Sequence, residues 1–137
     1  MKNALIIFVR NPVLGKVKTR IAAALGEQEA LRIYSALLQH THDISLSIAA
    51  DKYVFYSDHP QLGDIWEENI YHKFLQAGEA LGHKMKSAFN RMFENSYSRV
   101  VITGSDCLEL TSAIIENAFT ALKDNEAVIG PAKDGGY

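Results

Sequence analysis

Short apolar runs alternate along this chain with longer stretches in which apolar residues recur at helical spacing. The runs predict five strands, at residues 4–9, 53–57, 70–76, 99–104 and 126–132. The helical spacing predicts three main helices, over about residues 31–44, 79–94 and 111–123, and a short helix near residues 65–66. Strands that alternate with helices indicate an α/β fold with a mostly parallel sheet, helices on both faces and right-handed crossovers.

This architecture predicts where a ligand would bind before any motif is considered. In an open parallel sheet, ligands bind beyond the carboxyl ends of the strands, where the strand order reverses. The first and fourth strands commonly meet at that point. The loops at residues 10–20 and 104–110 are therefore the candidate site.

Composition is that of an ordered globular protein. The 137 residues are 47% hydrophobic and 22% charged, which predicts one domain over residues 1–137. No apolar run approaches the roughly 18 residues of a membrane span, and the N-terminus lacks a signal-peptide layout, so we expect a cytoplasmic protein without a membrane span. Cys107 is the only cysteine; this excludes an internal disulfide and a Cys-based zinc site and suits a reducing compartment.

Positive charge is concentrated near the N-terminus. Residues 1–26 contain five of the 14 basic residues and none of the 16 acidic ones, although the whole chain has a net charge of −2. A nucleic-acid binder would usually show a broad basic face with interleaved aromatic residues, so we expect no nucleic-acid partner. A single short basic loop is better suited to a small anionic ligand.

The two candidate loops carry complementary chemistry. The first, NPVLGKVKTR, places Lys16, Lys18 and Arg20 within five residues, after Gly15. These cations could neutralise phosphate oxygens, Arg20 in a bidentate manner, while the glycine lets the backbone approach the ligand. In the second loop, Asp106 follows the fourth strand closely, as required of a carboxylate that holds Mg²⁺ on a polyphosphate.

Other interpretations of these loops stay open. Lysines on a surface loop can be merely solubilising, Gly15 can simply shape a turn, and Asp106 can be a helix N-cap or an Asx-turn residue. A Walker-type ATPase is disfavoured because Arg10 and Val17 stand where that motif needs Gly and Ser or Thr. Cys107, without a neighbouring histidine, is expected to be a small buried packing residue rather than a nucleophile.

Several segments resemble, in order, the motifs of a bacterial protein family. FVRNPVLGKVKTRIAAALG is similar to the opening of the DUF2064 proteins, whose usual form is Lys-x-Pro-x-x-Gly-x-x-Lys-Thr-Arg-Leu. QAGEALGHKMKSAF, GSDC and GPAKDGGY resemble three later motifs of that family. The chain departs from the pattern at Arg10, which replaces a lysine, and at Leu108, which replaces a proline. DGGY normally leads into a further stretch of the domain, so we expect the chain to be incomplete at its C-terminus.

The resemblance implies a fold and a set of site residues. DUF2064 proteins belong to the glycosyltransferase-A, or nucleotide-diphospho-sugar transferase, superfamily, which implies a Rossmann-like three-layer sandwich. The implied catalytic residues are Lys18, Arg20 and Asp106. Asp106 and Asp134 are the implied ligands of Mg²⁺ or Mn²⁺. The implied nucleotide-binding residues are Arg10, Gly15, Lys16, Lys18, Thr19, Arg20, Gln76, Gly78, Gly82 and Ser105.

The implied chemistry is transfer from an activated nucleotide. In a glycosyltransferase, an acceptor hydroxyl attacks the anomeric carbon of a nucleotide-diphospho-sugar and the nucleoside diphosphate leaves. In a nucleotidylyltransferase, a phosphorylated small molecule attacks the α-phosphorus of a nucleoside triphosphate. A non-catalytic nucleotide-binding module is the third possibility. The expected partners are a nucleotide sugar or nucleoside triphosphate and a small-molecule acceptor, with a possible homodimer formed along the edge of the fifth strand.

Overall fold

The structure is a computed structural model that describes residues 3–12, 19–105 and 107–122, without the side chains of residues 19–21. Its elements, in chain order, are β1 (Asn3–Val9), α1 (Thr19–Leu25), α2 (Glu27–Ser45), β2 (Asp51–Tyr56), β3 (Tyr71–Leu75), α3 (Leu81–Glu94), β4 (Arg99–Thr103) and α4 (Ser112–Ala121). Within these residues, no helix is both long and apolar enough to span a membrane.

The described strands form one parallel sheet in the order β3-β2-β1-β4. β1 lies between β2 and β4, and Ile7 pairs with Val54 on one side and with Thr103 on the other. The α/β class, the parallel sheet and the adjacency of the first and fourth strands are therefore confirmed. The fifth strand expected at residues 126–132, and the dimer edge expected from it, lie outside the described residues.

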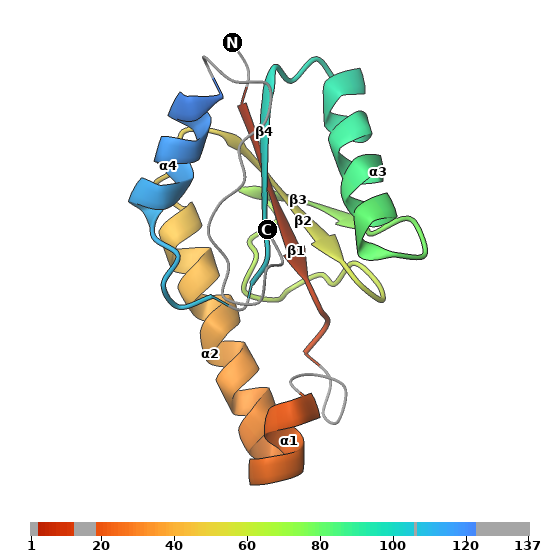
Figure 1. Ribbon diagram of the computed structural model, residues 1–137, viewed down its shortest axis with the longest axis vertical. Helices are drawn as coiled ribbons and strands as arrows, with labels where there is room; N and C mark the ends of the chain where they lie inside the picture. The colour runs from red at the N-terminus through yellow and green to blue at the C-terminus, as the bar shows by residue number, and fades with distance from the viewer. Residues whose placement is uncertain (1–2, 13–18, 106, 123–137) are drawn as a thin grey trace.

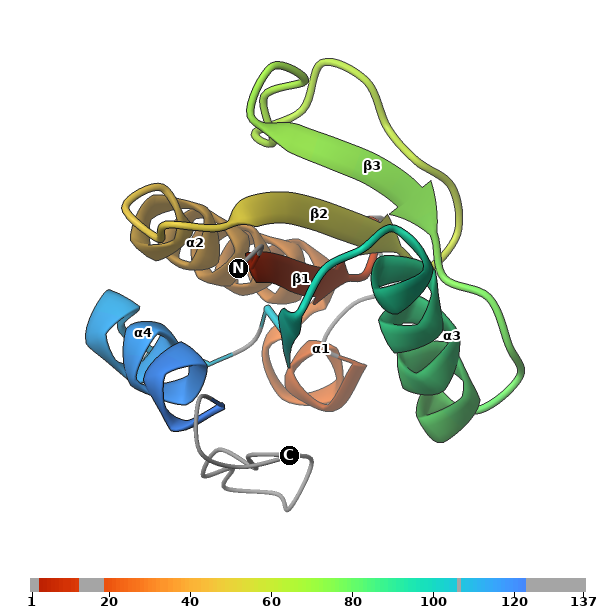
Figure 2. The ribbon, with the colours of Figure 1, turned by 90° about the horizontal axis from the view of Figure 1, so that it is seen from above.

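Helices cover both faces of this sheet. In Figure 1, α2 and α4 lie on one side of the strands and α3 lies on the other, and Figure 2 shows the same three layers from above. Leu5 and Ile7 of β1 pack in the core under α2 and α4, whereas Ala4 and Ile6 pack toward α3. Successive residues of a strand point to opposite faces, so a strand covered on both sides is an unbroken apolar run.

α1 is a helix that the apolar pattern does not predict. Gly26 separates it from α2, with a φ of 97° that a residue with a side chain rarely adopts. The Gly26 amide donates to the Ala22 carbonyl at 2.8 Å and so closes α1. Leu25 is 63% exposed. Ala23 and Ala24 are exposed as well, so the side chains of α1 that the structure describes, at residues 22–25, form no clear buried stripe. Such a stripe is what makes a helix recognisable in a sequence.

The short helix expected near residues 65–66 is wrong. This part of the β2–β3 connection consists of turns and bends. The Trp66 amide donates to Asp64 Oδ1 at 3.0 Å, a local side-chain contact that competes with helical hydrogen bonding. The indole of Trp66 is 1% exposed and packs in the core under α2. The buried ring of Trp66 holds this segment in place, so its one apolar contact does not require a helix.

Candidate functional site

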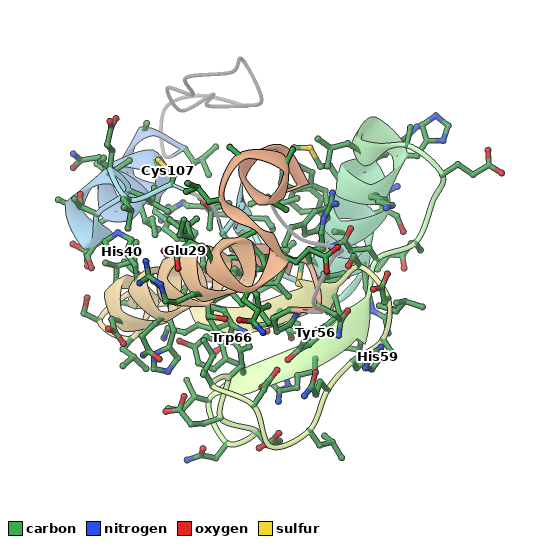
Figure 3. All side chains as sticks on the ribbon, turned by 90° about the horizontal axis from the view of Figure 1, so that it is seen from below. Glu29, His40, Tyr56, His59, Trp66 and Cys107 are labelled. Atoms are coloured by element: carbon green, nitrogen blue, oxygen red, sulfur yellow. The ribbon has the colours of Figure 1, made fainter. Side chains whose placement is uncertain are left out.

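The carboxyl ends of β1, β2 and β4 open onto one edge of the sheet, because all three strands are parallel. Figure 3 looks onto this edge from below, with Cys107 beside α4 and His59 on the other side of α1. The loop at residues 10–20 leaves β1 here, and the loop at residues 104–110 leaves the neighbouring β4. The two loops singled out from the sequence therefore start side by side, as expected.

Asn11 ties the end of β1 to the loop after β2. Its side chain is 1% exposed. Asn11 Oδ1 accepts hydrogen bonds from the amides of Asp58 at 3.0 Å and His59 at 3.3 Å, and Asn11 Nδ2 donates to the His59 carbonyl at 2.9 Å. The Asn11 amide also donates to Ser57 Oγ at 3.3 Å. This cluster, which we call the Asn11 clasp, holds the exposed residues 58–59 beside the start of the basic loop.

Tyr34 of α2 links the loops of β1 and β4. Its hydroxyl oxygen accepts a hydrogen bond from the Arg10 backbone amide at 2.7 Å and is 3.0 Å from Ser105 Oγ, where either hydroxyl can donate. Tyr34 and Ser105 are each 5% exposed, whereas Arg10 is exposed. Two residues that the resemblance assigns to nucleotide binding, Arg10 and Ser105, are thus brought to the same hydroxyl.

Gln76, the residue directly after β3 (Tyr71–Leu75), connects the carboxyl ends of β1 and β2. Its Nε2 donates to the carbonyl of Val9 at 3.1 Å and to that of Phe55 at 2.9 Å, so it joins the ends of β1 and β2. This donor group is therefore engaged by the backbone. A contact between Gln76 and a nucleotide, which stays a prediction, would have to use the carboxamide oxygen.

The two glycines expected to approach a nucleotide differ in their surroundings. Gly78 has a φ of 124°, and a Cβ there would lie 3.0 Å from that of His83. The tight turn between β3 and α3 is enough to require this glycine. Gly82 lies in the first turn of α3 with open space where a Cβ would be, so the turn does not explain it, and its contact with a nucleotide stays a prediction.

Most of the predicted phosphate and metal ligands lie outside the described residues. They are Gly15, Lys16, Lys18, Asp106 and Asp134. Thr19 and Arg20 are the first two residues of α1, but the structure does not describe their side chains. The roles of these residues therefore stay predictions. Among the described residues, no three His, Cys, Asp or Glu side chains gather closely enough to hold a metal ion.

A charged network fixes the loop that connects β2 to β3. The Tyr56 hydroxyl donates to Asp64 Oδ2 at 2.5 Å, and Lys73 Nζ lies 2.8 Å from Asp64 Oδ1 and 2.7 Å from Glu68 Oε1. The hydrogen bond from Lys73 lowers the pKa of Glu68 to about 2. Burial, together with the neighbouring Asp64 carboxylate, raises the pKa of Tyr56. All four groups are satisfied by one another, which is typical of a structural network rather than a reactive one.

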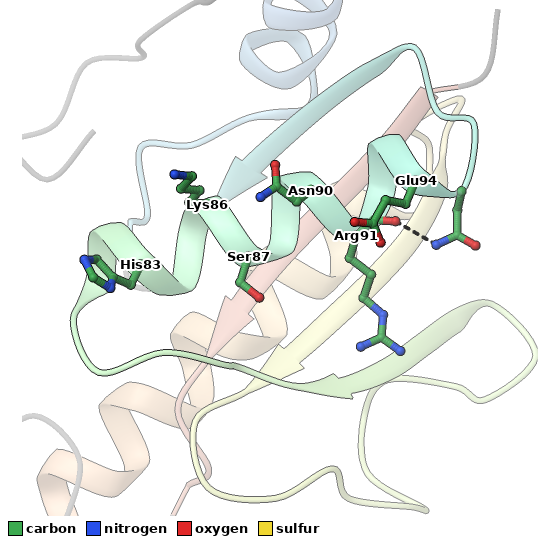
Figure 4. A pocket seen from close by; sticks show the side chains of 7 residues that line it. His83, Lys86, Ser87, Asn90, Arg91 and Glu94 are labelled. Carbon is green, nitrogen blue, oxygen red and sulfur yellow. Dashed lines mark hydrogen bonds between the residues drawn. The ribbon is translucent and has the colours of Figure 1, made fainter.

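Cys107 is exposed in the structure, so its expected role as a buried packing residue is wrong. β4 ends at Thr103, four residues before Cys107. Cys107 therefore lies in the loop after the strand and not in the part of the sheet that the helices cover. A pocket of about 700 Å³ lies along α3, with His83, Lys86 and Arg91 in its lining (Figure 4). Its lining belongs to α3 and the residue that follows, so it is not part of the site between β1 and β4.

Comparisons with known proteins identify a family and a related structure. The model of the family described as "Uncharacterized protein conserved in bacteria (DUF2064)" matches residues 32–137, which begin after the basic loop. A crystal structure described as that of a "putative nucleotide-diphospho-sugar transferase" from Desulfovibrio desulfuricans G20 matches 98% of this chain, with 31% identity and a TM-score of 0.85. This chain spans 61% of the length of that protein's chain. No curated protein matches.

Proposed function

We propose that this chain, which belongs to the DUF2064 family, acts in glycosyl transfer from a nucleotide-diphospho-sugar. The observation that carries the proposal is the match to the Desulfovibrio protein over 98% of this chain. The description of that protein names its class as nucleotide-diphospho-sugar transferase. Because this chain spans 61% of that protein's length, the acceptor and the activity of the whole protein are part of the proposal as well.

The arrangement of the sheet supports a phosphate site. β1 and β4 are neighbours, so the loop that contains Lys16, Lys18 and Arg20 starts beside the loop that contains Asp106. Three cations within five residues are suited to the two phosphate groups of the donor. The Asn11 clasp holds the loop after β2 at the same edge, which leaves exposed polar groups next to the proposed phosphate site.

The proposed chemistry is transfer of the glycosyl group to an acceptor hydroxyl. The oxygen of an acceptor hydroxyl would form a bond to the anomeric carbon and lose its proton, while the bond from that carbon to the diphosphate breaks and the nucleoside diphosphate leaves with the electron pair. Lys18 and Arg20 would stabilise the charge that develops on the leaving diphosphate. Asp106 and Asp134 would hold Mg²⁺ or Mn²⁺, an ion that supplies further charge neutralisation there. Carboxylate oxygens together with phosphate oxygens are a donor set that suits these hard cations.

The density of cations favours one alternative, a nucleotidylyltransferase. In that reaction a phosphate of the acceptor attacks the α-phosphorus of a nucleoside triphosphate, and pyrophosphate leaves. Lys16, Lys18 and Arg20 would then stabilise the pyrophosphate, which is more highly charged than a nucleoside diphosphate. The two reactions need different donors, and a binding experiment separates them.

The test is a thermal-shift panel on the full chain. UDP-, GDP- and dTDP-linked sugars and the corresponding triphosphates are each added with and without Mg²⁺ or Mn²⁺. A metal-dependent shift with a nucleotide sugar supports glycosyl transfer. A shift with triphosphates alone supports nucleotidyl transfer. No shift with either class contradicts both reactions and favours a module that has lost its nucleotide site.

Alanine variants at Lys16 and Lys18 locate the site. Loss of a charged hydrogen bond to phosphate costs about 1.5–3 kcal/mol, or roughly 10- to 150-fold in affinity. Lys86→Ala is a control of matched charge, because Lys86 is an exposed lysine on α3 and lies outside the basic loop. Equal nucleotide affinity in all of these variants would mean that the basic loop is only a solvated turn.

A further inference from the structure

α3 has an exposed outer face, on the side that points away from the sheet. Its buried residues, Ala88 and Met92, pack against the sheet, while α2 and α4 cover the other side of the sheet (Figure 1). Phe93 is 52% exposed, and its ring stacks on that of Phe89 with 6.3 Å between the centroids. Aromatic residues are enriched where proteins associate, so the outer face of α3 is a candidate interface.

The pocket of about 700 Å³ runs along this face. Its lining extends from His83 to Asn95, and every lining residue except Asn95 belongs to α3. Figure 4 shows these side chains spread along a single helix. A hollow with one helix as its wall is open on the other side, so a second helix has room to lie along α3.

The polar side chains of the outer face form a row. Lys86, Asn90 and Glu94 follow one another at intervals of four residues, which places them on one face of a helix. All three are exposed. Gly82 continues the row into the first turn of α3. A row of this kind can pack along the same row of another helix.

We propose that this row is the interface at which a second copy of the chain docks, with the two α3 helices antiparallel. A two-fold axis at the level of Ala88 pairs residues that are equally far from that position on either side. Lys86 then faces the partner's Asn90 and lies one turn from the partner's Glu94. Glu94 in turn lies beside the partner's His83, in the first turn of the partner's helix.

The same register gives the exposed aromatic ring a contact. Phe93 lies opposite the partner's Gly82. Open space surrounds the position that a Cβ of Gly82 would take, so the ring can pack close to the backbone of the partner helix. The turn between β3 and α3 does not explain Gly82, whereas this contact uses it.

The charges favour the antiparallel orientation. His83 and Lys86 lie in the first half of α3, and Glu94 is its last residue, so opposite charges meet only when the helices run in opposite directions. In a parallel two-fold pair each residue would face its own copy, and like charges would repel. Arg91 does not disturb this pattern, because its guanidinium lies over the Phe74 ring, 3.9 Å from the centroid.

One helix from each copy makes a small interface. The 14 residues of α3 span about 21 Å. Such a contact buries less than the roughly 800 Å² per partner that is usual for stable complexes. We therefore expect a reversible dimer with a Kd on the order of 0.1 mM.

Sedimentation velocity on the full chain, from about 10 μM to about 1 mM, brackets this Kd. The parent should change from monomer to dimer over this range. Lys86→Glu places a carboxylate near the partner's Glu94, and Glu94→Lys places an ammonium group near the partner's His83. Each change occurs twice in a symmetric dimer, so each variant should raise the Kd by roughly 5- to 30-fold.

An equimolar mixture of the two variants is the sharpest test. In a mixed pair one chain carries two carboxylates in the row and the other carries two ammonium groups, so the charges are complementary again. The mixture should dimerise at least as well as the parent, although each variant alone does not. Recovery in the mixture also excludes misfolding as the cause of the loss.

Glu116→Lys is the control of matched charge. Glu116 is an exposed residue of α4, on the other side of the sheet from α3 (Figure 1), and this variant should dimerise like the parent. A parent chain that stays monomeric at about 1 mM overturns the proposal. A dimer that neither charge reversal weakens also overturns it, because the contact then lies elsewhere on the chain. Neither result bears on nucleotide binding.

Discussion

Replacing Asn11 with alanine tests whether the Asn11 clasp holds the edge of the sheet together. The substitution removes a buried carboxamide and its three hydrogen bonds, two of them accepted from Asp58 and His59 and one donated to His59. Ser57 keeps its bond to the Asn11 backbone amide. The change is therefore confined to the side-chain part of the clasp.

The expected cost follows from what the partners can do afterwards. Three net hydrogen bonds of about 0.5–1.5 kcal/mol each give a range of about 1.5–4.5 kcal/mol. Asp58 and His59 are both exposed, so water can replace the lost partner and the full penalty of an unsatisfied buried group does not apply. We therefore expect a loss of about 2 kcal/mol in the free energy of unfolding, in the lower half of that range.

Urea unfolding followed by tryptophan fluorescence measures this loss. Trp66 is the only tryptophan and is 1% exposed, so its emission should change strongly on unfolding. With an m-value of about 1–3 kcal/mol/M, a loss of 2 kcal/mol moves the midpoint by about 0.7–2 M. Asn90→Ala, on the exposed face of α3, is the control and should be neutral or slightly stabilising.

Asn11→Asp sharpens the result. It keeps an acceptor for the two amides but removes the donor to the His59 carbonyl at 2.9 Å and places a carboxylate oxygen against that carbonyl. It should be at least as destabilising as Asn11→Ala at neutral pH and less so when the carboxyl group is protonated. If Asn11→Ala shifts the midpoint no more than Asn90→Ala does, the clasp does not stabilise the edge and the reasoning is wrong.

Three further predictions concern charge. Burial alone would lower the pKa of His42, but hydrogen bonds from its ring to Asp43 and Glu67 more than offset this and raise that pKa above its usual 6.5. The stability it contributes is fully present below about pH 6.5 and is lost as the pH rises through the folded-state pKa. His42→Gln should therefore flatten the fall in urea midpoint between about pH 6 and pH 9, and parallel curves would contradict this. Asp106→Ala should abolish the metal dependence of nucleotide binding in calorimetry without changing the circular dichroism spectrum; unchanged metal dependence would make Asp106 only a cap or turn residue. Arg20→Lys keeps the charge but removes the planar fork, so calorimetry should show weaker nucleotide binding only if the contact is bidentate.

The strands and the main helices could be predicted because burial imposes a repeating pattern on them. β1 is apolar at successive positions since helices cover both faces of the sheet. α2 shows its buried stripe at Tyr34, Leu37 and Leu38. The described side chains of α1, at residues 22–25, show no such stripe. Trp66 is held by its buried ring and by a local bond to Asp64, so periodicity predicts neither segment.

The polar residues that organise the site also differ in how far the sequence predicts them. The role of Asn11 could have been predicted. A polar residue directly after a buried strand, at the carboxyl end of a parallel sheet, is commonly needed for hydrogen bonds in the loops there. Tyr34 could not, since its spacing is that of an ordinary core position and its hydroxyl partners, Arg10 and Ser105, are 24 and 71 residues away. A periodic pattern reports which face of a helix is buried, but not which polar atom a buried ring carries to a distant loop.

The proposed function depends most directly on whether the full chain binds a nucleotide through its diphosphate at the edge between β1 and β4. The decisive measurement is a calorimetric titration of UDP-, GDP- and dTDP-linked sugars with Mg²⁺ into the parent chain and into Lys18→Ala. We predict saturable, metal-dependent binding of at least one of these donors that Lys18→Ala weakens by roughly 10- to 150-fold. Binding of no donor, or equal affinity in the two chains, would contradict the proposal.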